Sequence, residues 1–163
     1  DGRLRIPRKP RKDAHITPSS HRPPVLASDC LLLWTTPHSK TFQTSLEAGL
    51  PDTAILKLFQ VMSHSLDEST HSNYGAGLLR FTQFCDTNNI PEVDRMPASE
   101  SLLSSFAASA AGLTSEKTLS NWLAGLHYWH VINGAPWRGA GVLHHVRQDF
   151  AKLVPPSSKW AKR

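Results

Sequence analysis

Two stretches of the chain carry apolar residues at the spacing of an amphipathic helix. Between Thr70 and Cys85 the apolar residues recur at steps of three and four, namely Tyr74, Leu78, Phe81, Phe84 and Cys85. Between Thr118 and His130 the same spacing places on one stripe Leu119, Trp122, Leu123, Leu126 and either Trp129 or His130. Because a helix turns once every 3.6 residues, each stretch predicts a helix with one buried face.

Start and stop signals extend this prediction to five helices, over residues 51–66, 69–87, 99–111, 115–134 and 141–154. Ser69 or Thr70 is expected to cap the second helix, and Ser115 to begin the fourth. The residues expected to be buried on the other three helices are Ile55, Leu58, Phe59, Met62 and Leu66, then Leu102, Leu103, Phe106 and Ala110, then Val142, Val146, Phe150 and Leu153. The spacing predicts an all-α bundle around one core.

Residues 1–49 are predicted to form an arm ahead of this bundle. Residues 1–27 hold five prolines and few large apolar groups, so they bury too little surface to offset the entropy of ordering. Within the arm, a short helix at 28–34 is expected to dock on the bundle. Gly75 and Gly77 each cost a helix about 1 kcal/mol relative to Ala, which indicates close packing against another backbone.

Several of these residues resemble the N-terminal, core-binding domain of tyrosine recombinases and phage-type integrases. The matching positions are the Thr-x-x-x-Tyr helix start at Thr70 and Tyr74, the following apolar Leu78 and Phe81, and the Leu-x-small-Leu of Leu123, Gly125 and Leu126. The segments 72–81 and 133–137 are similar to recombinase-like proteins of fungal mobile elements. The resemblance covers residues 50–163 and implies a four- to five-helix orthogonal bundle of the SAM-like kind with an extended basic N-terminal arm.

The resemblance implies that the chain binds duplex DNA as the core-binding half of a recombinase clamp and positions a recombination site. It divides the chain into the arm at 1–49, the core-binding domain at 50–156 and the basic start of a linker at 157–163. The catalytic domain of the family would follow Arg163, so we expect no catalytic residue, no cofactor and no DNA cleavage here. The family usually places basic residues where this chain has Gly75–Gly77, so this helix should grip DNA weakly.

The net charge of +5 is distributed unevenly along the chain. Residues 1–40 sum to +5, residues 41–136 to −5 and residues 137–163 to +5. Because Lys and Arg neutralise phosphates, the two ends are the predicted electrostatic contacts with DNA. The mixture of Arg and Pro in the arm suits an A·T-rich minor groove, but it equally suits a nuclear localisation signal or a solubilising tail.

We therefore predict DNA contacts at the two ends and on two helices. The residues at the ends are Arg3, Arg5, Arg8, Lys9, Arg11, Lys12, Lys159, Lys162 and Arg163. The residues on the polar faces of the two helices are Thr70, Ser72, Asn73, Arg80, Ser115, Lys117, Thr118, Asn121 and His127. Hydroxyl and amide groups suit phosphate oxygens, and Asn121 also suits an adenine edge. An ordinary solvated helix face is the alternative for each of them.

Histidine spacing invites a metal interpretation that we do not favour. His127 and His130, joined by His144 or His145, have a suitable spacing, but no carboxylate or thiolate accompanies them. His130 can instead form hydrogen bonds inside an aromatic core. We predict no metal site.

Cys30 and Cys85 are expected to be reduced, because Cys85 lies on a buried helix face and disulfides are rare inside cells. A disulfide between them is the alternative. The chain begins with Asp1 and holds neither a signal segment nor a run of 18 apolar residues, so we expect an intracellular, nuclear piece of a longer protein with no membrane partner.

The sequence is also compatible with a second function, that of a protein-interaction module. A domesticated remnant could act as a protein-interaction or oligomerisation module, which the acidic middle segment and Gly75–Gly77 favour. The partners expected from the sequence are duplex DNA and further copies of the chain in a recombinase-type assembly, with no small-molecule substrate.

Overall fold

The computed structural model describes residues 16–110 and 113–142, and within these ranges it contains seven helices and no strand. The helices are α1 (Cys30–Leu33), α2 (Pro37–Gly49), α3 (Asp52–His64), α4 (Glu68–Thr87), α5 (Glu92–Arg95), α6 (Glu100–Ser109) and α7 (Glu116–Ile132). The predicted all-α fold is confirmed. Helices α3, α4, α6 and α7 begin and end within two residues of predicted helices. The predicted helix 141–154 lies outside the described residues beyond Val142.

Side chains cap the two central helices. Ser115 caps α7 as predicted, because its Oγ accepts a hydrogen bond from the Thr118 N–H at 3.2 Å. The cap of α4 differs from the prediction, since the carboxylate of Asp67 accepts from the Thr70 N–H at 2.7 Å. That hydrogen bond lowers the pKa of Asp67. A carboxylate also suits the positive end of the helix dipole, which explains why Asp67 caps α4 rather than Ser69 or Thr70.

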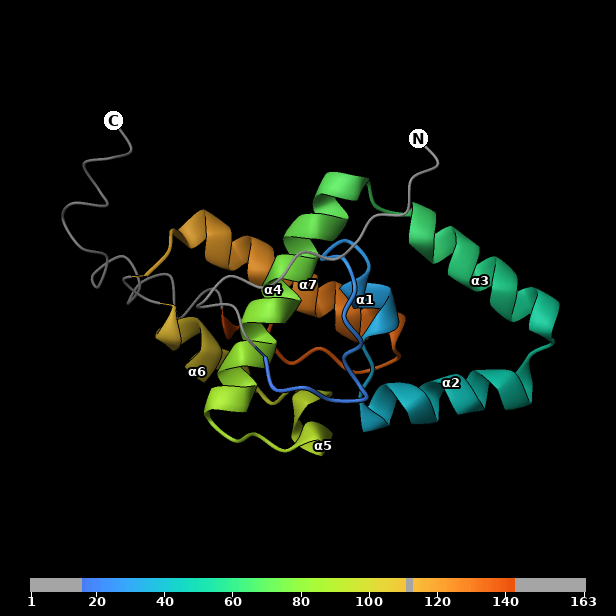
Figure 1. Ribbon diagram of the computed structural model, residues 1–163, viewed down its shortest axis with the longest axis horizontal. Helices are drawn as coiled ribbons and strands as arrows, with labels where there is room; N and C mark the ends of the chain where they lie inside the picture. The colour runs from blue at the N-terminus through green and yellow to red at the C-terminus, as the bar shows by residue number, and fades with distance from the viewer. Residues whose placement is uncertain (1–15, 111–112, 143–163) are drawn as a thin grey trace.

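Helices α4 and α7 cross at the centre of the fold, with α4 in front of α7 in Figure 1. A Cβ added at Gly77 would lie 2.6 Å from the Cα of Trp122, and one added at Gly125 would lie 2.7 Å from the Cα of Tyr74. The helices thus meet backbone to backbone, which glycine alone permits. The predicted stripe is buried at Leu78, Phe81, Cys85, Leu119, Leu123, Leu126 and Trp129.

Replacing Gly77 with alanine is expected to lower the free energy of unfolding by about 2 kcal/mol. Overpacking against a backbone atom that cannot move costs up to about 3 kcal/mol, and the better helix propensity of alanine returns about 1 kcal/mol. Chemical denaturation measures the change. The matched control is Gly49→Ala, where an added Cβ meets nothing within 4 Å and stability should not fall. Equal stabilities for the two variants would contradict the close crossing.

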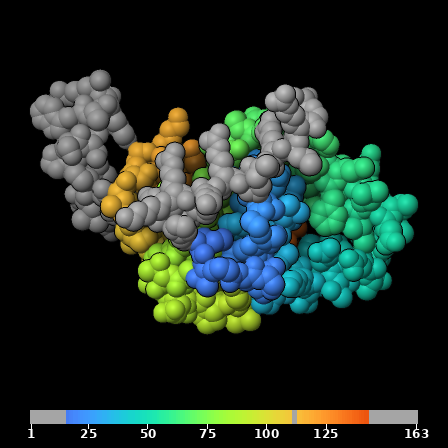
Figure 2. All heavy atoms as spheres, viewed as in Figure 1, coloured from blue at the N-terminus to red at the C-terminus, as the bar shows by residue number. Residues whose placement is uncertain are grey.

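The N-terminal segment packs against α4 on the side away from α7. A Cβ at Gly75 would collide with the carbonyl group of Ala27, so the close approach predicted for Gly75 is also confirmed. Cys30, Leu31 and Trp34 are buried in the common core. In Figure 2 this blue segment lies across the middle of the visible face. The predicted short helix is therefore present as α1, and the core extends to the N-terminal side of residue 50, where we had placed its start.

Two ion pairs formed by buried arginines attach the N-terminal segment to the C-terminal end of α4. The guanidinium group of Arg22 binds Glu92 of α5 with two hydrogen bonds, one of them 3.0 Å long. Arg95 pairs with Asp86 of α4 at 2.9 Å and donates its Nε–H to the carbonyl of Ile90 at 3.0 Å. The second oxygen of Asp86 accepts the Thr17 N–H at 2.8 Å. Four charges thus join residues 17–22, α4 and α5.

The predicted burial of the helix at 51–66 is wrong for two of its five residues. Ile55 is buried and Met62 and Leu66 are half-buried, but Leu58 and Phe59 are 37% and 36% exposed. Leu56 and Val61, which were not predicted to be buried, are 61% and 58% exposed. The reason is α2, which was not predicted. Helices α2 and α3 form a hairpin that extends away from the bundle at the right of Figures 1 and 2, so α3 has little core to cover.

Candidate nucleic-acid interface

Lys117 and Asn121 lie one turn apart on the exposed side of α7. Helical geometry separates them by about 40° around the axis, while Leu119, Leu123 and Leu126 occupy the buried side. Neither the side chain of Lys117 nor that of Asn121 forms a hydrogen bond or an ion pair with another residue in the described part of the chain. Both head groups are therefore available to an external ligand. A residue that contacts DNA must have such a free polar group.

The other predicted residues of α7 are already engaged. His127 is exposed, but its ring stacks on Trp137 with the centroids 5.0 Å apart and an interplanar angle of 13°. Ser115 and Thr118 share a 2.9 Å hydrogen bond between their hydroxyl groups in the cap of the helix. These three side chains stabilise the helix and its surroundings, so α7 offers Lys117 and Asn121 as its free polar pair.

On α4, the predicted contacts are less favourable. Arg80 lies over the ring of Trp122 at 6.0 Å and donates to the Gln83 amide oxygen at 3.3 Å. Ser72 is half-buried, whereas Asn73 is exposed. Asp67 and Glu68 at the helix N-terminus repel the phosphate that Thr70 was predicted to contact. Together with the lack of basic residues at Gly75–Gly77, these carboxylates predict that α4 contributes little to DNA binding.

Positive charge is scarce in the described part of the chain. It holds seven Lys and Arg against ten Asp and Glu. Two of the seven, Arg22 and Arg95, are buried in ion pairs. Nine of the predicted contacts, the basic residues at 3–12 and at 159–163, lie outside the described residues. Any phosphate-binding charge beyond that of Lys117 and a few other surface cations must therefore come from the two ends of the chain.

His130 is a structural residue of the core, as the sequence suggested. It is fully buried, its Nδ1–H donates to the Leu126 carbonyl at 2.8 Å, and its Nε2 accepts the Ala98 N–H at 3.0 Å. Burial lowers the pKa of His130 to about 4. Among the described residues, no group of three His, Cys, Asp or Glu side chains is arranged to bind a metal ion. His144 and His145 lie outside them.

Both thiols are buried and free, so the alternative of a disulfide is not observed. Burial raises the pKa of Cys30 and of Cys85 to about 12 in each case. A thiol with so high a pKa supplies almost no thiolate near neutral pH, which makes either residue a poor nucleophile. The predicted burial of Cys85 on its helix face is confirmed.

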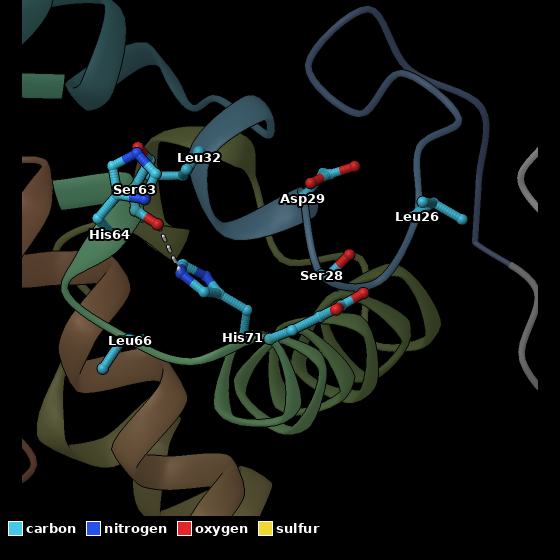
Figure 3. A pocket seen from close by; sticks show the side chains of 9 residues that line it. Leu26, Ser28, Asp29, Leu32, Ser63, His64, Leu66 and His71 are labelled. Atoms are coloured by element: carbon cyan, nitrogen blue, oxygen red, sulfur yellow. Dashed lines mark hydrogen bonds between the residues drawn. The ribbon is translucent and has the colours of Figure 1, made fainter. Parts of the chain in front are cut away.

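Sequence reasoning missed a pocket beside the N-terminus of α4. It has a volume of about 470 Å³, and its walls come from the turn before α1, the end of α3 and the start of α4. Figure 3 shows His71 rising from α4 into this pocket toward Ser63, with Asp29 across from it. The residues that line it are Leu26, Ser28, Asp29, Leu32, Ser63, His64, Leu66, Glu68 and His71. They come from two stretches of the chain, 26–32 and 63–71, that are more than 30 residues apart, so no local motif could have indicated the pocket.

Comparisons with known proteins return no match: no family model, no curated protein and no solved structure corresponds to the chain. In the described ranges, no helix has the length and the apolar character needed to cross a membrane.

Proposed function

We propose that this chain binds duplex DNA, as the core-binding half of a tyrosine recombinase-like protein that positions a recombination site. The observation that carries the proposal is the free, exposed pair of Lys117 and Asn121 on one face of α7. An ammonium group and an amide one turn apart can contact adjacent phosphates, or a phosphate and a base edge. The basic ends of the chain would supply the remaining charge.

A tyrosine recombinase of this kind cleaves DNA with residues of a separate domain, so the proposal makes this chain a binding module without catalysis. The resemblance of Thr70, Tyr74 and the Leu123–Leu126 segment supports this assignment, and so does the central crossing of the two helices that carry them. A nuclear location is part of the same proposal, because DNA is the target.

Replacing Lys117 and Asn121 together with alanine is expected to weaken duplex binding by about 2 to 3 kcal/mol without changing stability. The loss corresponds to one charge-assisted and one neutral hydrogen bond. Fluorescence anisotropy of a labelled duplex measures binding, and thermal melting measures stability. The matched control is the double substitution Lys57→Ala and Gln60→Ala on the exposed polar side of α3. If both double variants bind equally well, the α7 face is not the interface.

A protein-interaction module remains the second candidate, and one observation favours it. The exposed apolar residues of α3, with the acidic balance of the described part of the chain, suit a protein partner better than a polyanion. Salt separates the two functions. Binding to duplex DNA should weaken steeply as salt rises, because each phosphate contact releases counterions, whereas an apolar interface should strengthen or stay constant.

A further inference from the structure

We propose that the pocket beside the N-terminus of α4 binds an arginine side chain of the chain's own basic arm, from Arg3, Arg5 or Arg8. The arm would then be held on the protein and withdrawn from DNA. The docking itself is independent of the function proposed above, but its effect on DNA binding rests on that function.

The first support is a polar group with no partner at the base of the pocket. His71 is only 7% exposed. Its Nε2 lies 3.3 Å from the Ser63 carbonyl oxygen, and because a carbonyl only accepts, Nε2 carries the proton. The second ring nitrogen, Nδ1, is buried without a hydrogen-bond partner. In this tautomer Nδ1 is an acceptor, so it would be satisfied by a ligand that donates an N–H.

The second support is the sign of the charge around the opening. Asp29 and Glu68 line the pocket, and no Lys or Arg of the described residues does. The carboxylate of Asp29 caps no helix and forms no hydrogen bond within the described ranges. The carbonyl ends of α3 at Ser63 and His64 add partial negative charge. Such a site favours a cation, and a guanidinium group can donate to two or three acceptors at once.

The third support is the apolar wall. Leu26, Leu32 and Leu66 line the same pocket. Arginine and lysine bury their methylene groups against apolar surface while the charged head reaches polar groups, so this lining suits a long basic side chain better than a bare cation.

The length of chain between Thr17 and each basic residue decides which of these residues can reach the pocket. Thr17 is fixed to Asp86, and Glu68 stands 18 residues earlier on α4, which is about 27 Å along the helix. Arg8 precedes Thr17 by nine residues and can span about 30 Å when extended, and Arg5 and Arg3 can span more. Lys12 precedes Thr17 by five residues and spans only about 17 Å. Arginines 3, 5 and 8 therefore reach the pocket and Lys12 does not.

A weak contact is sufficient, because the arm is tethered to the protein that it binds. A short linker gives an effective concentration of the order of millimolar, so even a millimolar affinity would hold about half of the arms in the pocket. The competition for DNA follows directly. Duplex phosphates and the pocket would bind the same guanidinium groups, and the docked fraction would have to be released first.

The test is carried out on the full chain with a fluorophore on Ile6→Cys. The label attaches there because Cys30 and Cys85 are buried. We expect the anisotropy of the label to fall when about 0.5 M NaCl screens the contact. It should fall equally in Asp29→Asn and in the triple variant Arg3→Gln, Arg5→Gln, Arg8→Gln, which removes every arginine proposed to reach the pocket. Thermal melts of Asp29→Asn should match the parent, since this carboxylate caps nothing.

Two matched controls separate the pocket from general electrostatic attraction. Asp94→Asn removes an exposed acid on α5, and Arg11→Gln with Lys12→Gln removes two positive charges of the arm at positions near or below the limit of reach. Both should leave the anisotropy of the label unchanged. If they lower it as much as Asp29→Asn does, or if no variant lowers it, the proposal is wrong. An anisotropy that rises with protein concentration would assign the arm to a second copy and also overturn it.

DNA binding gives a separate readout. Asp29→Asn should bind a labelled duplex at least about twofold more tightly than the parent, because it frees the docked fraction of arms. If the anisotropy shows docking but no variant binds duplex, the docking stands and the DNA function fails. If duplex binds equally to the parent and to Asp29→Asn and the anisotropy shows no docking, the pocket proposal fails alone.

Discussion

Asp86→Ala is expected to lower the free energy of unfolding by about 3 to 5 kcal/mol, the largest effect of any substitution considered for this fold. The side chains of Asp86 and Arg95 are 11% and 8% exposed, and 2.9 Å separates their charged atoms. Without the carboxylate, Arg95 stays buried with Glu92 at 3.9 Å as its nearest counter-charge. The Thr17 N–H loses its acceptor in the same substitution.

Urea denaturation of the parent and the variant measures this loss. Asp94→Ala is the control, because Asp94 is an exposed acid of the neighbouring α5 and should change stability by less than about 0.5 kcal/mol. A second variant, Asp86→Ala with Arg95→Met, removes both charges and should recover a large part of the loss, since the buried cation is then gone. A loss below about 1 kcal/mol for Asp86→Ala would show that water already solvates the pair.

Acidification is expected to destabilise the protein by about 3 kcal/mol between pH 6.5 and pH 4 through His130. Burial holds the pKa of His130 at about 4, whereas the ordinary value is 6.5. Between pH 6.5 and pH 4, His130 binds a proton in the unfolded chain but stays unprotonated in the folded chain. Each pH unit in that window therefore costs about 1.4 kcal/mol, and the contribution is fully present above pH 6.5 and fully lost below pH 4.

A hydrogen bond as well as burial keeps the pKa of His130 low. The Ala98 N–H can only donate, so Nε2 of His130 must stay unprotonated to accept it at 3.0 Å. His130→Gln keeps one acceptor and one donor in the side chain but cannot titrate. The slope of unfolding free energy against pH should flatten in this variant, although its stability at pH 8 is lower than that of the parent. An unchanged slope would assign acid sensitivity to other groups, among them His21, whose pKa burial also lowers.

The candidate interface was predictable only in part. Periodicity placed Lys117, Asn121 and His127 on the open side of α7, because a helix fixes which residues share a face. It could not show that His127 would stack on Trp137, since these residues meet through a turn after the helix. Arg80 likewise contacts Trp122 across the crossing of two helices. Which polar groups remain free thus depends on partners that are distant in sequence.

The sequence alone determined the helices that carry their own signals. Period 3.6, a capping serine at residue 115 and Asn-Gly at residues 133–134 are local features, and they located α4, α6 and α7 to within two residues. The need for glycine at positions 75 and 77 was also local, because glycine inside a helix is unfavourable without a packing reason.

The tertiary structure decided which residues are buried and which charged groups form pairs. The hairpin of α2 and α3 leaves Leu58 and Phe59 more than a third exposed, although the spacing of apolar residues in α3 predicts that both are buried. Residues 16–36 join the core despite their prolines, because Arg22 and Thr17 find the carboxylates of Glu92 and Asp86 at a separation of about 70 residues. The pocket of Asp29 and His71 arises in the same way. Burial and charge pairing depend on residues that are distant in sequence. A local pattern can therefore predict that a helix has an apolar face, but it cannot predict which element packs against that face.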